Sequence, residues 1–527
     1  MTSRPRRIID LHTHMFNVRY LPLKGILHSW GVPLLLAAPL TVIFNSIAGR
    51  SKLDSRDAIS LENLSRYPSN EDELISEIYD LVEYSVYQDI EAVEFLSTVD
   101  ALEQNDIYNA LEELAEQHSS ELGSQFDNDA VLHSFSTIKL DVSTIDSEVK
   151  SRESFSAIMN PAYRLALTWA LKKLAVIAEA EVPMFHKAMS ALTFVSTLLR
   201  SERSIYRTLL SEYGERKVSL YMHLMMDMEK SYKNSSPYYD FEEQQLDRMS
   251  TLVSKSNGVL IGFSAYHPKR RNHIDIIKKG IEKGNVGVKF YPPMGYLASG
   301  NEPKIQSMVD DFFDFCMGND IPVFTHCTPV GFEAKKGFGL YSDPVYWRKA
   351  LEKFPKLRVC FGHAGGGKVK VCDTQFYGWF SNEDQWNSDD NYSRKVIELC
   401  QDYENVYCEL AYLHEIMNDS TEKDLLLARL VDVFTNDKGK YPISDKISYG
   451  SDWHMIDMIG ESNNYLESLI KIFQHPSLIE HIDKFFYKNA LSYLDLDSYL
   501  QRVERVNPNY FTFRSRNYLK SLADELV

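Results

Sequence analysis

His12 and His14 are the residues of this sequence whose type and spacing most directly suggest chemistry. They stand two apart in the apolar run of residues 7–14, and a β-strand places residues two apart on the same face. Two imidazoles enclosed together repel each other when both are protonated. A bound cation removes this repulsion by taking both as neutral ligands. The pair therefore predicts one side of a metal site.

Three more polar residues stand where apolar runs end. His326 ends PVFTH, His363 ends RVCFGH, and Asp452 follows ISYGS. A carboxylate beside the histidines could ligate a metal and take the proton from a metal-bound water. We predict that these residues join His12 and His14 in a single site.

The elements that must position these side chains are eight short apolar runs, bounded by Gly, Pro or Asn, which predict strands. They cover residues 7–14, 217–228, 258–268, 285–293, 321–327, 357–366, 405–412 and 446–454. From the third run onward, segments with helical periodicity separate them, which is typical of a parallel sheet covered by helices. Eight such units predict a (β/α)₈ TIM barrel. The alternative is an open doubly wound sheet, which the absence of a Gly-rich phosphate motif after the first run disfavours.

A barrel would explain the shared placement of the polar residues. Its active site lies at the carboxyl ends of the strands, where His326, His363 and Asp452 are predicted. Closure of the barrel also sets the eighth strand beside the first. We therefore expect Asp452 to lie near His12 and His14.

Residues 20–215 separate the first two strands and are far too many for a βα loop. Their pattern is mostly helical, so we expect a helical insertion over the barrel mouth. The catalytic barrel is then formed by residues 1–19 and 216–500, followed by a helical tail at 501–527. The apolar run at 31–44 is shorter than the roughly 18–20 residues of a spanning helix and contains Pro33 and Pro39, so we expect a buried hairpin or core helix.

The composition restricts the partners. The 527 residues include 57 Lys and Arg against 74 Asp and Glu, for a net charge of -17. Such an acidic surface repels phosphate backbones and anionic lipid, which disfavours nucleic acid and membranes as partners. The six cysteines form no C-x-x-C pair, and free thiols in a reducing cytoplasm explain them better than disulfides. We expect a cytoplasmic protein with a small-molecule substrate and no membrane span, and a homodimer stays open.

The motifs DLHTH, VKFYPP, FTHC, FGHAGG and GSDW together resemble the amidohydrolase superfamily, especially its amidohydrolase-related (amidohydrolase 2) branch. The resemblance follows the eight strands in order and leaves out the insertion. It implies a distorted barrel that holds one or two divalent metals, usually zinc. By position, the residues matching the recurring metal ligands are His12, His14, His326 and Asp452. His363 matches the strand-six histidine, which binds a second metal in binuclear members and contacts substrate or solvent in mononuclear members.

Lys289 is the ambiguous residue. It interrupts the apolar run GVKFY, where a bare ammonium is costly to bury. Binuclear relatives carboxylate a strand-four lysine to bridge two metals, and Lys289 has that position. The alternative is a lysine that extends to the barrel mouth or pairs with a substrate carboxylate.

Together these residues predict metal-assisted hydrolysis of an amide, ester or lactone-type bond in a small molecule. Asp452 would accept and return the proton, and His363 or the metal would polarise the carbonyl. The runner-up is a non-oxidative decarboxylase of an aromatic or enol-type carboxylic acid, as found in the same branch. Such decarboxylases often carry a carboxylate at the position of Asp10, but so do many hydrolases. A non-catalytic binding or scaffold barrel is the third hypothesis. Weaker candidates near strand ends are His223, Asp227, His267, His414 and His454.

Overall fold

The structure is a computed structural model that describes residues 4–29, 34–49, 197–213, 217–371, 373–456 and 462–526. The chain divides into two compact units. The first, here called the barrel unit, consists of Met1–Phe16, Tyr206–Ser231 and Tyr239–Val527. The second consists of Asn17–Ile205 and Tyr232–Tyr238.

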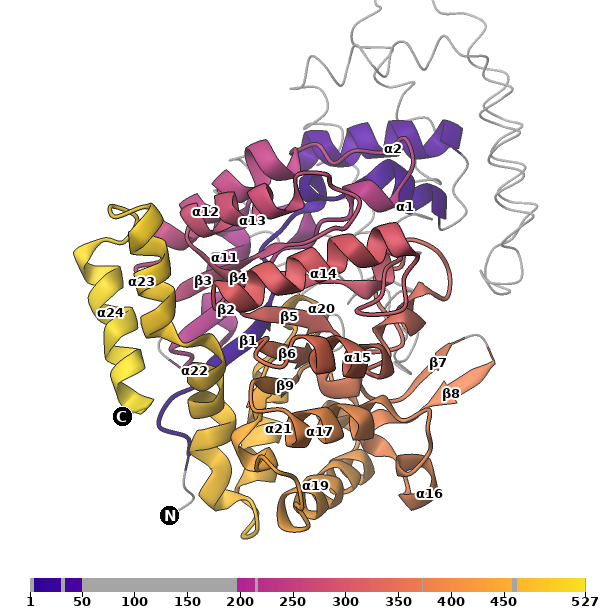
Figure 1. Ribbon diagram of the computed structural model, residues 1–527, viewed down its shortest axis with the longest axis vertical. Helices are drawn as coiled ribbons and strands as arrows, with labels where there is room; N and C mark the ends of the chain where they lie inside the picture. The colour runs from indigo at the N-terminus through magenta and orange to yellow at the C-terminus, as the bar shows by residue number, and fades with distance from the viewer. Residues whose placement is uncertain are drawn as a thin grey trace, which may run out of the picture. The chain divides into compact units, whose positions relative to one another are not determined.

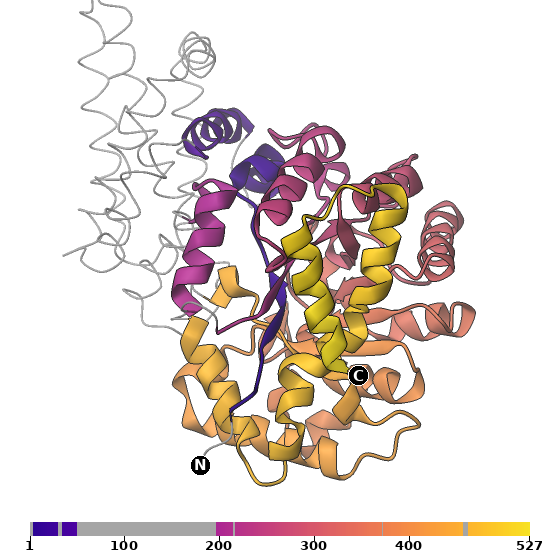
Figure 2. The same cartoon turned by 90° about the vertical axis from the view of Figure 1, so that its left-hand side faces the viewer.

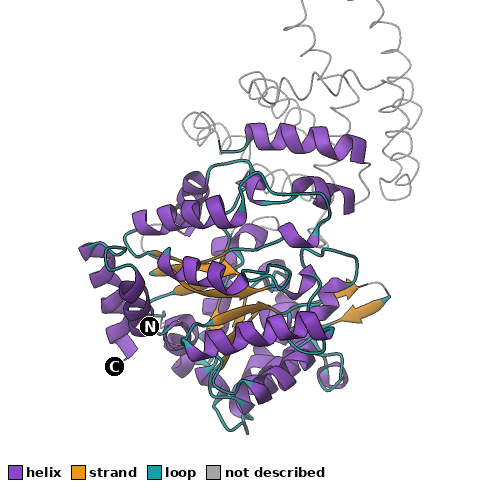
Figure 3. Cartoon of the chain, turned by 45° about the horizontal axis from the view of Figure 1, so that its top comes forward, coloured by secondary structure: helices purple, strands orange, loops and turns teal. Residues whose placement is uncertain are grey.

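The barrel unit is built on eight parallel strands in the order β1-β2-β3-β4-β5-β6-β9-β10. Helices surround these strands on the outside (Figure 3). Each strand falls within one of the eight apolar runs, which confirms the predicted TIM barrel. The strands are β1 (Ile9–Thr13), β2 (Leu220–Leu224), β3 (Leu260–Ala265), β4 (Asn285–Phe290), β5 (Val323–His326), β6 (Val359–Gly362), β9 (Val406–Leu410) and β10 (Ile447–Tyr449).

The barrel closes between β1 and β10, which lie at the two ends of this order. The amide of Asp452 donates to the carbonyl oxygen of His12 over 2.8 Å. The carboxylate of Asp10 accepts from the amide of Ser451 at 2.9 Å and from its hydroxyl at 2.6 Å. Residues that follow β10 therefore complete the barrel by binding to the first strand.

Helices follow the strands because their apolar residues recur on one face and pack on the sheet. The five helices expected between the third and eighth strands are present, and Figure 1 shows them around the barrel. They are α13 (His273–Glu282), α14 (Pro303–Gly318), α15 (Val345–Lys353), α17 (Tyr392–Asp402) and α19 (Ser420–Thr435). Helices that we did not predict are α12 (Leu246–Lys255), α16 (Glu383–Trp386), α18 (Glu415–Asn418), α20 (Trp453–Ile456), α21 (Ser462–Phe473) and α22 (Asn489–Leu494).

A small hairpin leaves the barrel after β6 and was also not predicted. It pairs β7 (Val369–Val371) with β8 (Thr374–Phe376) in antiparallel fashion, and it projects from the barrel in Figure 1. Each strand has only three residues, too few to give a clear alternating pattern.

Aromatic side chains fill the interior of the barrel below the candidate site. The ring of Phe263 on β3 lies 6.5 Å from that of Phe324 on β5 and 6.2 Å from that of Tyr493 on α22. The Tyr493 hydroxyl donates to the carbonyl oxygen of Val323 at 3.0 Å. Phe324 also contacts His12, with ring centroids 5.3 Å apart, so it packs directly beneath the candidate site.

The terminal helices α23 (Leu496–Val506) and α24 (Phe513–Ala523) lie side by side (Figure 2). They contact the amino-terminal ends of the strands. The hydroxyl of Tyr499 donates to the carbonyl oxygen of Gly284 at 2.9 Å, just before β4, and that of Tyr518 donates to Ser219 at 2.6 Å, just before β2. They therefore cover the end of the barrel opposite the strand ends that carry the candidate residues.

In the second unit the structure describes α1 (Leu23–Ser29), α2 (Leu34–Ile47) and the start of α11 (Glu202–Tyr213). Most of the apolar run at 31–44 forms α2, so it is a helix rather than a hairpin. None of the helices in the described part of the chain combines the length and apolar character that crossing a membrane requires. Residues 50–196 lie outside the described residues, and the roofing insertion at 20–215 stays a prediction.

Candidate metal centre

His12, His14 and Asp452 converge at the carboxyl ends of β1 and β10. The carboxylate oxygen Oδ1 of Asp452 lies 3.5 Å from Nε2 of His14 and 3.8 Å from Nε2 of His12. All three residues are buried, and the two imidazole rings have centroids 5.3 Å apart. The structure thus brings the sequence pair and the distant aspartate together as predicted.

Hydrogen bonds on the far side of each ring determine which nitrogen faces Asp452. Nδ1 of His14 lies 3.0 Å from the carbonyl oxygen of Leu224, and a carbonyl can only accept, so Nδ1 carries the proton. Nδ1 of His12 lies 2.8 Å from the carboxylate of Glu409 and donates to it when Glu409 is ionised. In the neutral ring the other nitrogen then carries no proton, and we call such an unprotonated nitrogen bare. Both histidines therefore present a lone pair on Nε2 towards Asp452.

His363 and His326 lie beside His12. The ring centroid of His363 is 4.6 Å from that of His12 and 4.9 Å from that of His326. Nδ1 of His363 lies 3.3 Å from the carbonyl oxygen of Ala411, and Nε2 of His326 lies 2.6 Å from that of Val330. By the same argument His363 keeps Nε2 bare and His326 keeps Nδ1 bare. Each ring can serve as a ligand through one nitrogen.

Lys289 on β4 enters the same interior. Its side chain is 1% exposed, and Nζ forms no hydrogen bond with any described residue. The ammonium nitrogen lies 4.4 Å from the centroid of the Phe324 ring and 5.8 Å from that of Tyr291. The side chain therefore does not extend to the solvent, and carboxylation and pairing with a substrate carboxylate stay as its two predicted roles.

Burial controls the protonation of these groups. It lowers the pKa of His326 to about 3 and those of His12 and His363 well below the usual range, with a further contribution from Lys289. It lowers the pKa of Lys289 to about 7, opposed by Asp452 and Glu409. It raises the pKa of Asp452 to about 7, opposed by Lys289. These three histidines are therefore neutral, as metal ligands must be.

The donor set fits a divalent cation. The buried Oδ1 atom of Asp452 forms no hydrogen bond with a described residue, although two bare imidazole nitrogens face it. Two groups could hold an ion among the described residues, namely His12 with His14 and Asp452, and His12 with His363 and Glu409. A cation would satisfy the lone pairs and favour the ionised carboxylates, while neutral nitrogen and carboxylate oxygen are ligands that zinc accepts. The site therefore suits a divalent metal.

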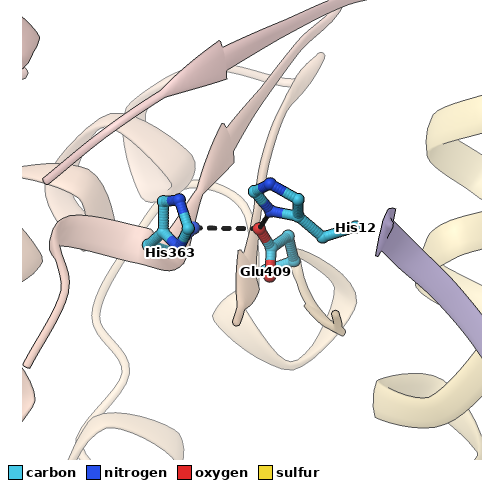
Figure 4. A group of neighbouring side chains, drawn as sticks. All are labelled: His12, His363 and Glu409. Atoms are coloured by element: carbon cyan, nitrogen blue, oxygen red, sulfur yellow. Dashed lines mark hydrogen bonds and ion pairs between the residues drawn. The ribbon is translucent and has the colours of Figure 1, made fainter. Parts of the chain in front are cut away.

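Glu409 is the residue that the sequence analysis missed. It is the penultimate residue of β9 and is 0% exposed. Its Oε1 atom accepts from Nδ1 of His12 and, at 2.9 Å, from the amide of His363. Figure 4 shows it between these two histidines. A signal existed, because an acidic residue at the end of the apolar run VYCEL follows the same pattern as Asp452.

Two site residues bend the backbone where their strands end. His363 has φ 62° and Asp452 has φ 53°, both in the left-handed region that residues other than glycine rarely adopt. This conformation turns the chain sharply, so each side chain is re-aimed towards the barrel interior. Strained residues of this kind gather at functional sites.

The weaker candidates are engaged elsewhere. The amide of Met15 donates to Nδ1 of His223 at 2.9 Å. His267 contacts the hydroxyl of Ser231 at 2.7 Å, and Asp227 pairs with Arg270. His414 is half-buried beside Tyr412 and Glu415. The side chain of His454 lies outside the described residues.

Residues 239–496 match the sequence model of the amidohydrolase family (amidohydrolase 2). This part of the chain belongs to that family of enzymes, which confirms the resemblance. The match includes Lys289, His326, His363 and Asp452. It begins after β2, so the structure, not the family match, connects the histidines of β1 with the others.

Several solved structures are similar to this chain. One is a probable 2-pyrone-4,6-dicarboxylic acid hydrolase from Acinetobacter baumannii with citric acid bound, with a TM-score of 0.38, 11% identity, and 55% of this chain and 88% of that chain covered. Another is 5-carboxyvanillate decarboxylase from Novosphingobium aromaticivorans with manganese. Its TM-score is 0.39 and its identity 13%, with 62% of this chain and 87% of that chain covered. A third is an amidohydrolase from Burkholderia multivorans with bound zinc. Its TM-score is 0.37 and its identity 7%, with 57% of this chain and 91% of that chain covered. No curated protein sequence matches the chain.

Proposed function

We propose that this amidohydrolase-family chain is a metal-dependent hydrolase that cleaves an amide, ester or lactone-type bond in a small molecule. The observation that carries the proposal is the convergence of Nε2 of His12 and Nε2 of His14 on Oδ1 of Asp452, 3.8 and 3.5 Å away, in a buried site. When bound, a divalent ion lowers the pKa of a water molecule to about 7 and so supplies a nucleophile at neutral pH.

We assign the metal to His12, His14, His326 and Asp452, and a second ion to His363 and Lys289. Zinc is the proposed metal because imidazole nitrogen and carboxylate oxygen suit it. The support for these ligands is their burial and the single bare nitrogen of each histidine.

Asp452 would move the proton. Its carboxylate accepts the proton of the attacking water and returns it to the departing oxygen or nitrogen, so the water is divided between the two products. A bound cation would favour the ionised form of this buried carboxylate, which is the form that accepts the proton. Nε2 of His363 carries no proton to donate to a carbonyl, so of the two groups expected to polarise the scissile carbonyl, His363 and the metal, we assign this role to the metal.

Buried cysteines support a reducing cytoplasm as the location. The described residues include five buried free cysteines, Cys316, Cys327, Cys360, Cys400 and Cys408. The candidate ligands are buried inside the barrel, which suits a small-molecule substrate, and the proposed assembly is a homodimer.

The test is a panel of lactones, esters, amides and aromatic acids, with released acid and released CO₂ measured separately for wild type and Asp452→Asn. We expect acid release by the wild type and a loss of at least about 10²-fold in the variant, since general acid–base catalysis contributes 10²–10⁴-fold. Release of CO₂ without hydrolysis would instead favour a decarboxylase. Equal hydrolysis by both proteins would contradict the role of Asp452.

A further inference from the structure

Glu409 connects parts of the barrel that are not adjacent in the strand order. It lies on β9, between β6 and β10, and its Oε1 atom binds the backbone amide of His363 after β6 at 2.9 Å. The same oxygen binds Nδ1 of His12 on β1 at 2.8 Å, beyond β10. One carboxylate oxygen therefore holds two histidines from opposite sides (Figure 4).

The chemistry of the donor fixes the direction of the bond to His363, and the ionised form of Glu409 fixes that of the bond to His12. A backbone amide can only donate, so Oε1 of Glu409 is an acceptor towards His363. Ionised, this carboxylate has no proton to give, so it also receives the Nδ1 proton of His12. This leaves Nε2 of His12 bare on the side of the ring that faces Asp452, 3.8 Å away.

Space for this carboxylate depends on Gly450. A Cβ atom at residue 450 would lie 2.3 Å from Oε2 of Glu409 and 3.2 Å from Cβ of His12. The first distance is closer than packed atoms tolerate and the second is a tight contact, so a side chain here would displace the Glu409 carboxylate and press on His12. Gly450 precedes Asp452 by two residues, so the sequence GSD supplies the space for Glu409 as well as the aspartate.

We propose that Glu409 is a positioning residue of the metal centre. It holds His12 in the tautomer that offers Nε2 to the metal and fixes the backbone at His363. Partners of this kind orient a ligating histidine and increase its basicity, and their loss typically weakens metal binding 10–100-fold. This inference rests on the proposed function, because it assumes that His12 is a ligand.

Its test is the zinc dissociation constant of metal-free protein, measured by competition with a chromophoric chelator. We expect Glu409→Ala to bind zinc 10–100-fold more weakly than wild type. Glu409→Gln should recover most of the affinity, because its amide oxygen can accept from both His12 and His363. Glu415→Gln is the matched control, since Glu415 accepts from the amide of Lys368 at 2.7 Å and should leave zinc affinity unchanged.

The outcomes separate the inference from the proposed function. A wild type that binds no zinc would overturn the proposed function itself. Zinc binding by Glu409→Ala as tight as by wild type would overturn the inference alone. Equal weakening by Gln and Ala would also overturn it, because Glu409 would then act by its charge, as a ligand. Gly450→Ala keeps the carboxylate but takes its space, so it should also weaken zinc binding; if Glu409→Ala fails to fold, unchanged zinc affinity in Gly450→Ala would overturn the inference.

Discussion

The backbone amide of Asp452 donates to the carbonyl oxygen of His12 over 2.8 Å, and this hydrogen bond joins the last strand of the barrel to the first. The side chains of the same two residues meet in the candidate metal centre, with Nε2 and Oδ1 3.8 Å apart. Closure of the barrel and assembly of the site are therefore one structural event. A change that loosens the junction of β1 and β10 should affect both stability and metal binding.

Ser451 tests this coupling. Its hydroxyl donates to Asp10 at 2.6 Å, and Ser451→Ala would leave a buried carboxylate oxygen without that donor. We expect the free energy of unfolding to fall by about 1–3 kcal/mol and zinc to bind more weakly. Ser448→Ala is the control, because the buried Ser448 hydroxyl forms no hydrogen bond with a described residue. Chemical denaturation of both variants measures the difference, and equal stability would contradict a role for the junction.

His223 should make the protein sensitive to acid. Burial lowers its pKa from 6.5 to about 3, so between these values the unfolded chain binds a proton that the folded protein does not. Stability from this group is complete above pH 6.5 and is lost as the pH falls towards 3. His223→Asn keeps an acceptor for the amide of Met15 and removes the titration.

The measurement is the free energy of unfolding of wild type and His223→Asn at several pH values from 4 to 7. The slope should be shallower in the variant by at most one proton, or about 1.4 kcal/mol per pH unit. Parallel curves would show that His223 does not titrate in this window.

Lys289 should make metal loading depend on carbon dioxide. Its buried nitrogen, with a pKa lowered to about 7, is largely neutral at slightly alkaline pH and can add CO₂ to become a carbamate ligand. We expect bicarbonate to increase the metal content of the wild type by about one ion per chain, and Lys289→Met to abolish this increase.

Lys446→Met is the control for that experiment, because Lys446 is also buried but donates to the carbonyl oxygen of Glu404. It should keep the bicarbonate effect. A wild type whose metal content ignores bicarbonate would contradict Lys289 as a ligand and leave it as a partner for a substrate carboxylate.

The barrel and the meeting of His12 with Asp452 could be predicted because each strand is a short apolar run with a distinctive end. Glu409 was not predicted as a site residue because one acidic residue in VYCELAY resembles an ordinary exposed strand position. The tautomers could not be predicted either. They depend on acceptors such as Leu224 and Glu409, which lie 210 and 397 residues from their histidines, and only the folded backbone determines those distances.

The hairpin of β7 and β8 shows a second limit. Its strands contain three residues each, and the pattern of so short a segment does not differ from that of a loop.

Asp10 shows a third limit of prediction from the sequence. A carboxylate at its position is found in decarboxylases and in many hydrolases, so the sequence did not distinguish them. In the structure both oxygens of Asp10 accept hydrogen bonds from Ser451, which links β1 to the residues after β10.

The most direct test of the central claim is the metal content per chain, measured by inductively coupled plasma mass spectrometry on protein loaded with zinc and dialysed. Wild type and His223→Asn, which changes a buried histidine outside the centre, should each retain one or two ions. His14→Ala removes one of the two Nε2 atoms that face Asp452 and should lose most of this metal while remaining folded. A wild type without bound metal, or a His14→Ala protein that retains as much as the wild type, would contradict the account.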